Sequence, residues 1–118
     1  MEIPPAQLVG FGGALGATLR YLVGEAIAAE SVPVDTLTVN VVGSFALGLL
    51  TALAASTEIA LLVGTGVCGS FTTYSSFSVE TVRLWEQGNR TQAVGYAGGT
   101  LVLCGLAVGL AFGVAAVV

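Results

Sequence analysis

A run of hydroxyl-bearing residues is the part of this chain best equipped for chemistry. The segment GSFTTYSSFSVE, residues 69–80, carries seven hydroxyls among its twelve residues. A single Ser or Thr in an apolar helix commonly bonds back to a carbonyl of its own helix or bridges to a neighbouring helix. A dense cluster preceded by glycines favours two other interpretations. One is a helix break that exposes backbone groups for ion binding, and the other is the wall of an aqueous or ion pathway.

Further polar side chains lie inside apolar stretches elsewhere. Asn40 offers two N–H donors and one acceptor, and taken alone it is either a bond between helices or part of a pathway. Tyr96, Thr100 and Cys104 recur at i, i+4 and i+8, so they share one face of a helix. That face is a candidate polar stripe facing the same pathway.

Charged residues near these stretches are few. Arg20 lies in an apolar context, and either its side chain reaches the membrane surface or it stands at the mouth of an anion pathway. Glu80 and Arg83 are three residues apart, which predicts an ion pair on one helix. Donors outnumber carboxylates at depth, which favours a small anion or a neutral polar solute as the permeating species.

The composition shows what must position these groups. The chain has 118 residues, 55% hydrophobic and 8% charged, whereas a soluble domain is typically about 25% charged. A chain this short cannot hide that apolar fraction in a core, so membrane lipid is its natural surrounding. Long charge-free windows predict an all-α membrane protein, a single domain over residues 1–118 with four transmembrane helices at about 4–28, 36–55, 59–87 and 91–118. Gly88-Asn89 predicts the turn before the last helix.

Glycines are spread through these predicted helices. Gly12-x3-Gly16 and the series Gly105, Gly109, Gly113 have the small-x3-small spacing that lets helices approach closely in lipid. The partner helix belongs either to the same chain or to another.

Several classes of function are disfavoured. The net charge is −4 with no His, so neither nucleic acid nor the commonest general base is expected. Cys68 and Cys104 are predicted to be small buried hydrophobes, because two thiols without His form no metal site. No enzyme and no organic cofactor is predicted. Arg90 gives its loop only a slight edge for the cytoplasmic side, so insertion in either orientation is expected.

Three segments resemble, in order and spacing, the signature segments of the Fluc (CrcB) family of fluoride channels. They are GGALGATLRY (12–21), TLTVNVVGSFALG (36–48) and GTGVCGSFTTYSSFSVE (64–80). The resemblance implies a multi-pass protein of the cell membrane that exports fluoride passively and relieves its toxicity. It also implies an antiparallel, dual-topology dimer with two pores, formed with itself or with a homologous subunit, and a third helix broken in mid-membrane.

The resemblance also implies residue roles. Gly69 and Thr72 would offer backbone carbonyls to a structural Na⁺ on the dimer axis, Arg20 would lie near a vestibule, and Glu80 would be a buried carboxylate. The fluoride pathway would include Asn40, Tyr74, Ser76, Phe77, Tyr96 and Thr100. Two positions depart from the family pattern: Tyr74 replaces a Phe, and Cys104 replaces a Ser or Thr.

Two other classes of protein fit the sequence less well. A proton-coupled exporter of the small multidrug resistance type needs a carboxylate within the first helix, where this chain has Arg20 instead. A non-transporting membrane subunit held by its glycine faces would leave the hydroxyl cluster unexplained.

Overall fold

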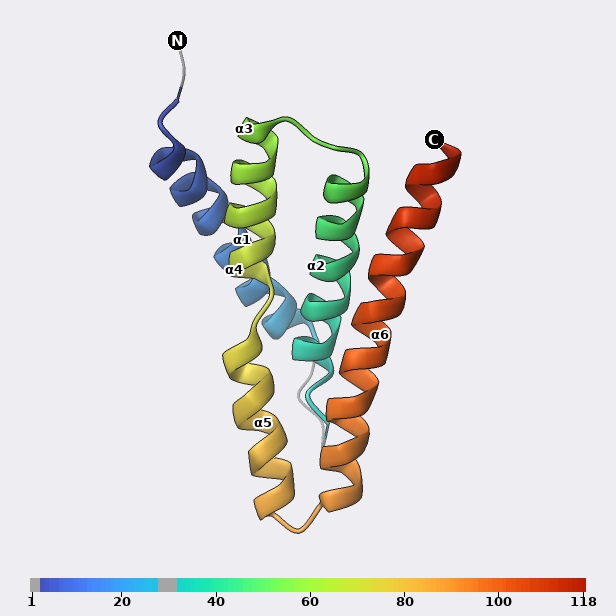
Figure 1. Cartoon of the computed structure of the whole chain (residues 1–118). Helices are drawn as coiled ribbons and strands as arrows, with labels where there is room; N and C mark the ends of the chain where they lie inside the picture. Colours follow the sequence, from blue (N-terminus) through green and yellow to red (C-terminus); the bar gives the residue numbers. More distant parts are fainter. Residues whose placement is uncertain (1–2, 28–31) are drawn as a thin grey trace.

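The computed structural model describes residues 3–27 and 32–118, and all regular structure in these ranges is helical. Three long helices and one composite segment make up the chain (Figure 1). The elements are α1 (Pro5–Ala26), α2 (Val34–Ala52), α3 (Thr57–Ile59), the π-helical stretch η1 (Ala60–Cys68), α4 (Gly69–Phe71), α5 (Tyr74–Glu86) and α6 (Arg90–Val117).

The helix ends differ from the predicted ones by a few residues. Helix α2 begins two residues early, at Val34, because Pro33 occupies the N-cap, and it ends at Ala52, shortly before Ala54 takes a positive φ of 53°. Helix α1 ends at Ala26, while residue 28, the predicted end, lies outside the described residues. The predicted turn before the last helix is confirmed, since Gly88 has a φ of 87°, a conformation that glycine adopts without a Cβ clash.

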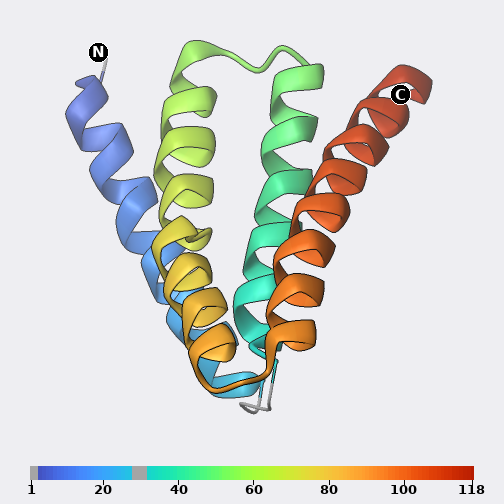
Figure 2. The same ribbon diagram turned by 60° about the horizontal axis from the view of Figure 1, so that its bottom comes forward.

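The elements form two packed pairs. α1 lies along η1 and α4, and α2 lies along α6. The two pairs converge at the α5–α6 turn and separate toward the end where α1 begins and α6 ends (Figures 1 and 2). α5 also packs on α6, where Leu84, Ala93 and Tyr96 form a small buried cluster.

Glycines allow the close contact between α1 and the third segment. A Cβ on Gly12 would meet the Leu62 carbonyl oxygen, and a Cβ on Gly16 would meet the Val67 carbonyl oxygen. The Gly12-x3-Gly16 pattern is therefore confirmed as a packing face within the chain. The face carrying Gly105, Gly109 and Gly113 is open, since a Cβ on any of them would have no described atom within 4 Å.

The outer surface is apolar. Phe11, Leu101 and Leu106 each expose more than three-fifths of their surface, at 66%, 75% and 64%. Helices α2 and α6 are long and apolar enough to cross a membrane by length and composition. An all-helical chain with apolar side chains directed outward is what a lipid environment favours.

Candidate functional site

Two extended residues separate α4 from α5, within the hydroxyl-rich segment. Thr72 has φ −82° and ψ 163°, and Thr73 has φ −151° and ψ 123°. Thr73 is also the N-cap of α5: its hydroxyl accepts a hydrogen bond from the Ser76 N–H at 3.1 Å. This is the usual way in which a threonine starts a helix.

Asn40 of α2 holds this interruption from the side. Its Nδ2 donates to the Thr73 carbonyl at 2.9 Å, and its Oδ1 accepts from the Thr73 N–H at 2.7 Å. Asn40 therefore satisfies both backbone groups of one extended residue, and its side chain is buried. An amide has two N–H donors, so one N–H of Asn40 is left over from this pair.

The interruption frees backbone carbonyl groups. In an unbroken helix the Thr73 N–H would donate to the Gly69 carbonyl and the Ser76 N–H to the Thr72 carbonyl. Here the first donor is taken by Asn40 and the second by the Thr73 hydroxyl. The carbonyls of Gly69 and Thr72, the two predicted to face a cation, are thus among those at the interruption that lose their helical donors.

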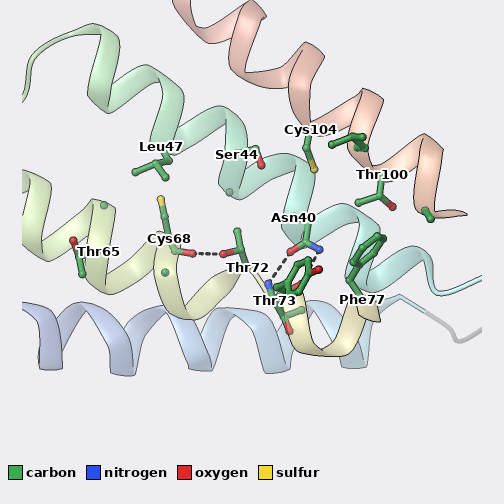
Figure 3. Close-up of a pocket in the computed structure, with 16 residues that line it drawn as sticks. Asn40, Ser44, Leu47, Thr65, Cys68, Thr72, Thr73, Phe77, Thr100 and Cys104 are labelled. Carbon is green, nitrogen blue, oxygen red and sulfur yellow. Dashed lines mark hydrogen bonds between the residues drawn. The ribbon is translucent and has the colours of Figure 1, made fainter. Parts of the chain in front are cut away.

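A cavity of about 680 Å³ opens beside the interruption (Figure 3). Residues of α2, η1, α4, α5 and α6 contribute to its wall, which contains no Asp, Glu, Lys or Arg. Six of the ten predicted site residues line it: Asn40, Gly69, Thr72, Tyr74, Phe77 and Thr100. Ser76, Tyr96, Arg20 and Glu80 are not part of this wall.

Thr100 is the most unusual polar group of the cavity. The residue is 7% exposed, and its hydroxyl has no hydrogen-bond partner among the described residues. A buried hydroxyl without a partner costs free energy, which makes it a candidate for contact with a ligand. Cys104, one helical turn away, lines the same wall, so the predicted stripe on α6 faces the cavity at both positions.

Three aromatic rings continue from the cavity toward α6. The centroids of Tyr74 and Phe77 lie 6.0 Å apart, and those of Phe77 and Tyr96 lie 5.4 Å apart, each pair inclined at 43°. Tilted rings expose electropositive edges to a neighbouring anion. The Tyr74 side chain is 81% exposed in the single chain, whereas Tyr96 is buried.

Arg20 and Ser76 form a separate pair beside the cavity. Arg20 Nη2 donates to Ser76 Oγ at 2.6 Å, which links α1 to the first turn of α5. Because the guanidinium has only donors, Ser76 accepts in this bond and its own hydroxyl hydrogen stays available. The pair can therefore offer an O–H donor that is polarised by a neighbouring positive charge.

Glu80 joins three helices instead of pairing along its own. It accepts from Thr36 Oγ1 at 3.2 Å and from the Tyr96 hydroxyl at 3.3 Å. The predicted Glu80–Arg83 ion pair is wrong: Glu80 is turned toward α2 and α6, and the exposed Arg83 makes no ion pair within the described part of the chain. The Glu80 carboxylate is thus bonded to the hydroxyls of Thr36 and Tyr96 on neighbouring helices, and not to the Arg83 guanidinium.

Sequence reasoning missed the roles of Thr73 and Thr36. The spacing of Thr73 three residues before Ser76 is compatible with an N-cap, but nothing in the pattern distinguishes it from its hydroxyl neighbours. The sequence predicts Thr36 only as the start of the second helix. Its bond to Glu80 joins residues 44 positions apart, which spacing along one helix cannot reveal.

Comparison with known proteins gives one consistent result. The sequence profile of the family described as "CrcB-like protein, Camphor Resistance (CrcB)" matches residues 7–114. A protein of Haloarcula marismortui named "Fluoride-specific ion channel FluC 2" is 56% identical over 118 residues, covering 100% of this chain and 99% of the relative. "Fluoride-specific ion channel FluC 1" of Halobacterium salinarum is 52% identical over 92% of each chain. "Fluoride-specific ion channel FluC" of Agrobacterium fabrum is 46% identical over 90% of this chain and 93% of its own. These names describe ion channels and not enzymes.

Proposed function

Because the chain belongs to the CrcB family, we propose that it forms a passive fluoride channel in the cell membrane and relieves fluoride toxicity by export. The observation that carries the proposal is the cavity wall, which combines neutral donors with an absence of carboxylates among its residues. Such a wall attracts an anion more readily than a cation. The names of close relatives over the full length of the chain give independent support.

Fluoride is small and strongly hydrated, so a pathway must replace its lost water with fixed donors. Asn40 and Thr100 both line the wall, and the left-over N–H of Asn40 and the unpartnered hydroxyl of Thr100 would be two such donors. The ring edges of Tyr74 and Phe77 are two further electropositive groups. Ser76, polarised by Arg20, and the Tyr96 ring extend this route beyond the cavity.

The channel is proposed to be an antiparallel dimer with two pathways, in which each chain crosses the membrane four times. In the single chain, Tyr74 is largely exposed and the Gly105, Gly109 and Gly113 face is open. A second chain would cover these surfaces and enclose the cavity. In this arrangement the interruption at Thr72 and Thr73 lies at mid-membrane depth, where irregular backbone is tolerated only against protein or water.

A structural Na⁺ on the dimer axis fits the donor set at the interruption. The Gly69 and Thr72 carbonyls lack their helical donors, and oxygen atoms are the ligands that a hard cation prefers. These two carbonyls from each chain would hold the ion. The Na⁺ would supply a fixed positive charge that joins the two interrupted segments.

A growth assay tests the proposal in cells. A bacterial strain that lacks its own fluoride exporter would produce this chain together with a copy that carries Thr57→Lys, Glu58→Lys, Arg83→Gln and Arg90→Gln. This charge-reversed copy gains two Lys at the start of α3 and loses the two Arg at the α5–α6 turn, so an antiparallel pair can form whichever way the chain inserts. We expect growth on fluoride to be restored. Continued sensitivity, with both chains present in the membrane, would contradict the proposal.

A further inference from the structure

Two free thiols belong to the wall of the cavity, and they differ in exposure. Cys68 lies at the end of η1, and Cys104 lies on α6. Cys68 is 4% exposed, which agrees with the prediction of a small buried hydrophobe, whereas Cys104 is only half-buried, contrary to that prediction. Reactive cysteines are partly exposed and fully buried ones are inert. Cys104 is therefore the thiol that a ligand in the cavity can reach.

A second, independent feature marks the same part of the wall. The Thr100 hydroxyl is buried there without a hydrogen-bond partner among the described residues. Such a group costs free energy unless a ligand or water satisfies it. Thr100 and Cys104 are one turn apart, about 6 Å along the axis of α6, and both project from α6 on the side of the cavity (Figure 3). This turn therefore presents an oxygen and a sulfur atom to whatever occupies the cavity.

The chemistry of the wall favours a soft ligand. Its described residues include no carboxylate, and the chain contains no His, so the ligands that harder metal ions prefer are missing around Cys104. A thiol is the kind of ligand that soft metals select. Because the wall also carries no charged side chain, a bare cation is strongly disfavoured there. A neutral soft-metal compound enters such a cavity more readily.

We propose that Cys104 is a binding site for neutral, thiophilic metal compounds, of which methylmercury chloride is a simple example, and that its occupation closes the anion route. In the reaction the Cys104 S–H bond and the Hg–Cl bond break and an S–Hg bond forms. The proton and the chloride leave to water, and no electron is transferred.

The bound group would lie beside the donor that an anion needs. The cavity, at about 680 Å³, is in the size range that holds drug-sized molecules, so a methylmercury group fits. One turn of helix separates it from the Thr100 hydroxyl, where it would displace water or an anion. The closing of the route rests on the proposed fluoride channel, whereas the binding to Cys104 does not.

Mass measurement tests the binding without any transport. Liposomes that contain the full-length chain and its charge-reversed copy are exposed to methylmercury chloride, and the label is located by intact mass and peptide mapping. We expect one methylmercury group per chain, on Cys104. When both chains carry Cys104→Ser they should take up none, and with Cys68→Ser they should take up as much as the unchanged pair. No uptake by the unchanged pair, or equal uptake by Cys104→Ser, would overturn the proposal.

Fluoride efflux from the same liposomes tests the closing of the route, with each protein compared with its own untreated efflux. We expect methylmercury to abolish the efflux of the unchanged pair, and an excess of dithiothreitol, which competes for the mercury, to restore it. The efflux of Cys104→Ser should resist the treatment. Undiminished efflux through labelled protein, or an equal loss in Cys104→Ser, would show that Cys104 does not control the route. Absent efflux before treatment would instead count against the proposed channel, and the mass measurement would still test the binding site.

Discussion

At the scale of single residues, Asn40 has two roles: it holds the interruption between α4 and α5, and it lines the cavity. It satisfies both backbone groups of Thr73, and one of its N–H groups is not used in that pair. The sequence left open whether this amide bonds another helix or lines a pathway, and the family resemblance implied the pathway. In the structure the amide bonds Thr73 and also lines the cavity. The sequence could not identify Thr73 as the partner, because the two residues are 33 positions apart and no local spacing links them.

Asn40→Asp should weaken the bonding to Thr73 and also make the cavity less favourable for an anion. The carboxylate can still accept from the Thr73 N–H, but it cannot donate to the Thr73 carbonyl, and it places a negative charge beside the anion route. We expect a loss of about 1–3 kcal/mol in the free energy of unfolding and loss of fluoride efflux. Thr38→Val is the matched control, since the Thr38 hydroxyl only bonds back to Val34 and its loss should matter little. Normal efflux through Asn40→Asp would refute the donor role.

Thr100→Val should separate stability from transport. The substitution removes a buried hydroxyl without a described partner and keeps the side-chain shape. Stability should be unchanged or higher by about 1 kcal/mol, while efflux should fall about tenfold through the loss of one donor to an anion. Thr51→Val, at an exposed hydroxyl bonded to Leu47, should change neither. A less stable protein with full efflux would show that Thr100 is structural.

At the scale of elements, the interruption between α4 and α5 follows from competition for donors. The Thr73 N–H bonds to Asn40 and the Ser76 N–H bonds to the Thr73 hydroxyl, so the helical ladder cannot continue. The long apolar segments were predictable from the spacing of charges. The π-helical register of Ala60–Cys68 was not, because it depends on backbone bonding that no residue pattern in the segment specifies.

The contact between α1 and η1 predicts which glycines resist substitution. A Cβ on Gly12 would meet the Leu62 carbonyl oxygen and lie 2.9 Å from Gly66 Cα, and both are backbone atoms. Gly12→Ala should therefore lower the free energy of unfolding by about 1–3 kcal/mol, measured by thermal melting in detergent. Gly13→Ala, one residue along and with no described atom within 4 Å, should be tolerated. Equal melting temperatures would show that the two helices do not pack as described.

At the scale of the whole molecule, Arg83 and Arg90 lie at the α5–α6 turn, whereas Arg20 is bonded to Ser76 beside the cavity. The order of the predicted helices is enough to place Arg83 and Arg90 at the same end. The open cavity and the exposed Tyr74, by contrast, required the three-dimensional structure.

The proposed Na⁺ site makes a prediction for the assembled channel. A cation bound only by the folded dimer stabilises it by mass action. Replacing Na⁺ with N-methyl-D-glucamine, which is too large to lie between backbone carbonyls, should lower the melting temperature and increase the monomer fraction. The comparison is made on the purified mixture of this chain and its charge-reversed copy. Identical melting and dimer fractions in both buffers would contradict a structural role for Na⁺ at Gly69 and Thr72.

The central claim is that the donor-lined, carboxylate-free cavity conducts fluoride. Its most direct test is anion efflux from liposomes that contain this chain together with its charge-reversed copy, followed in parallel with fluoride- and chloride-selective electrodes. We predict rapid fluoride efflux, and chloride efflux no faster than from protein-free liposomes. Equal efflux of the two anions, or no fluoride efflux from vesicles shown to contain the assembled dimer, would contradict the claim.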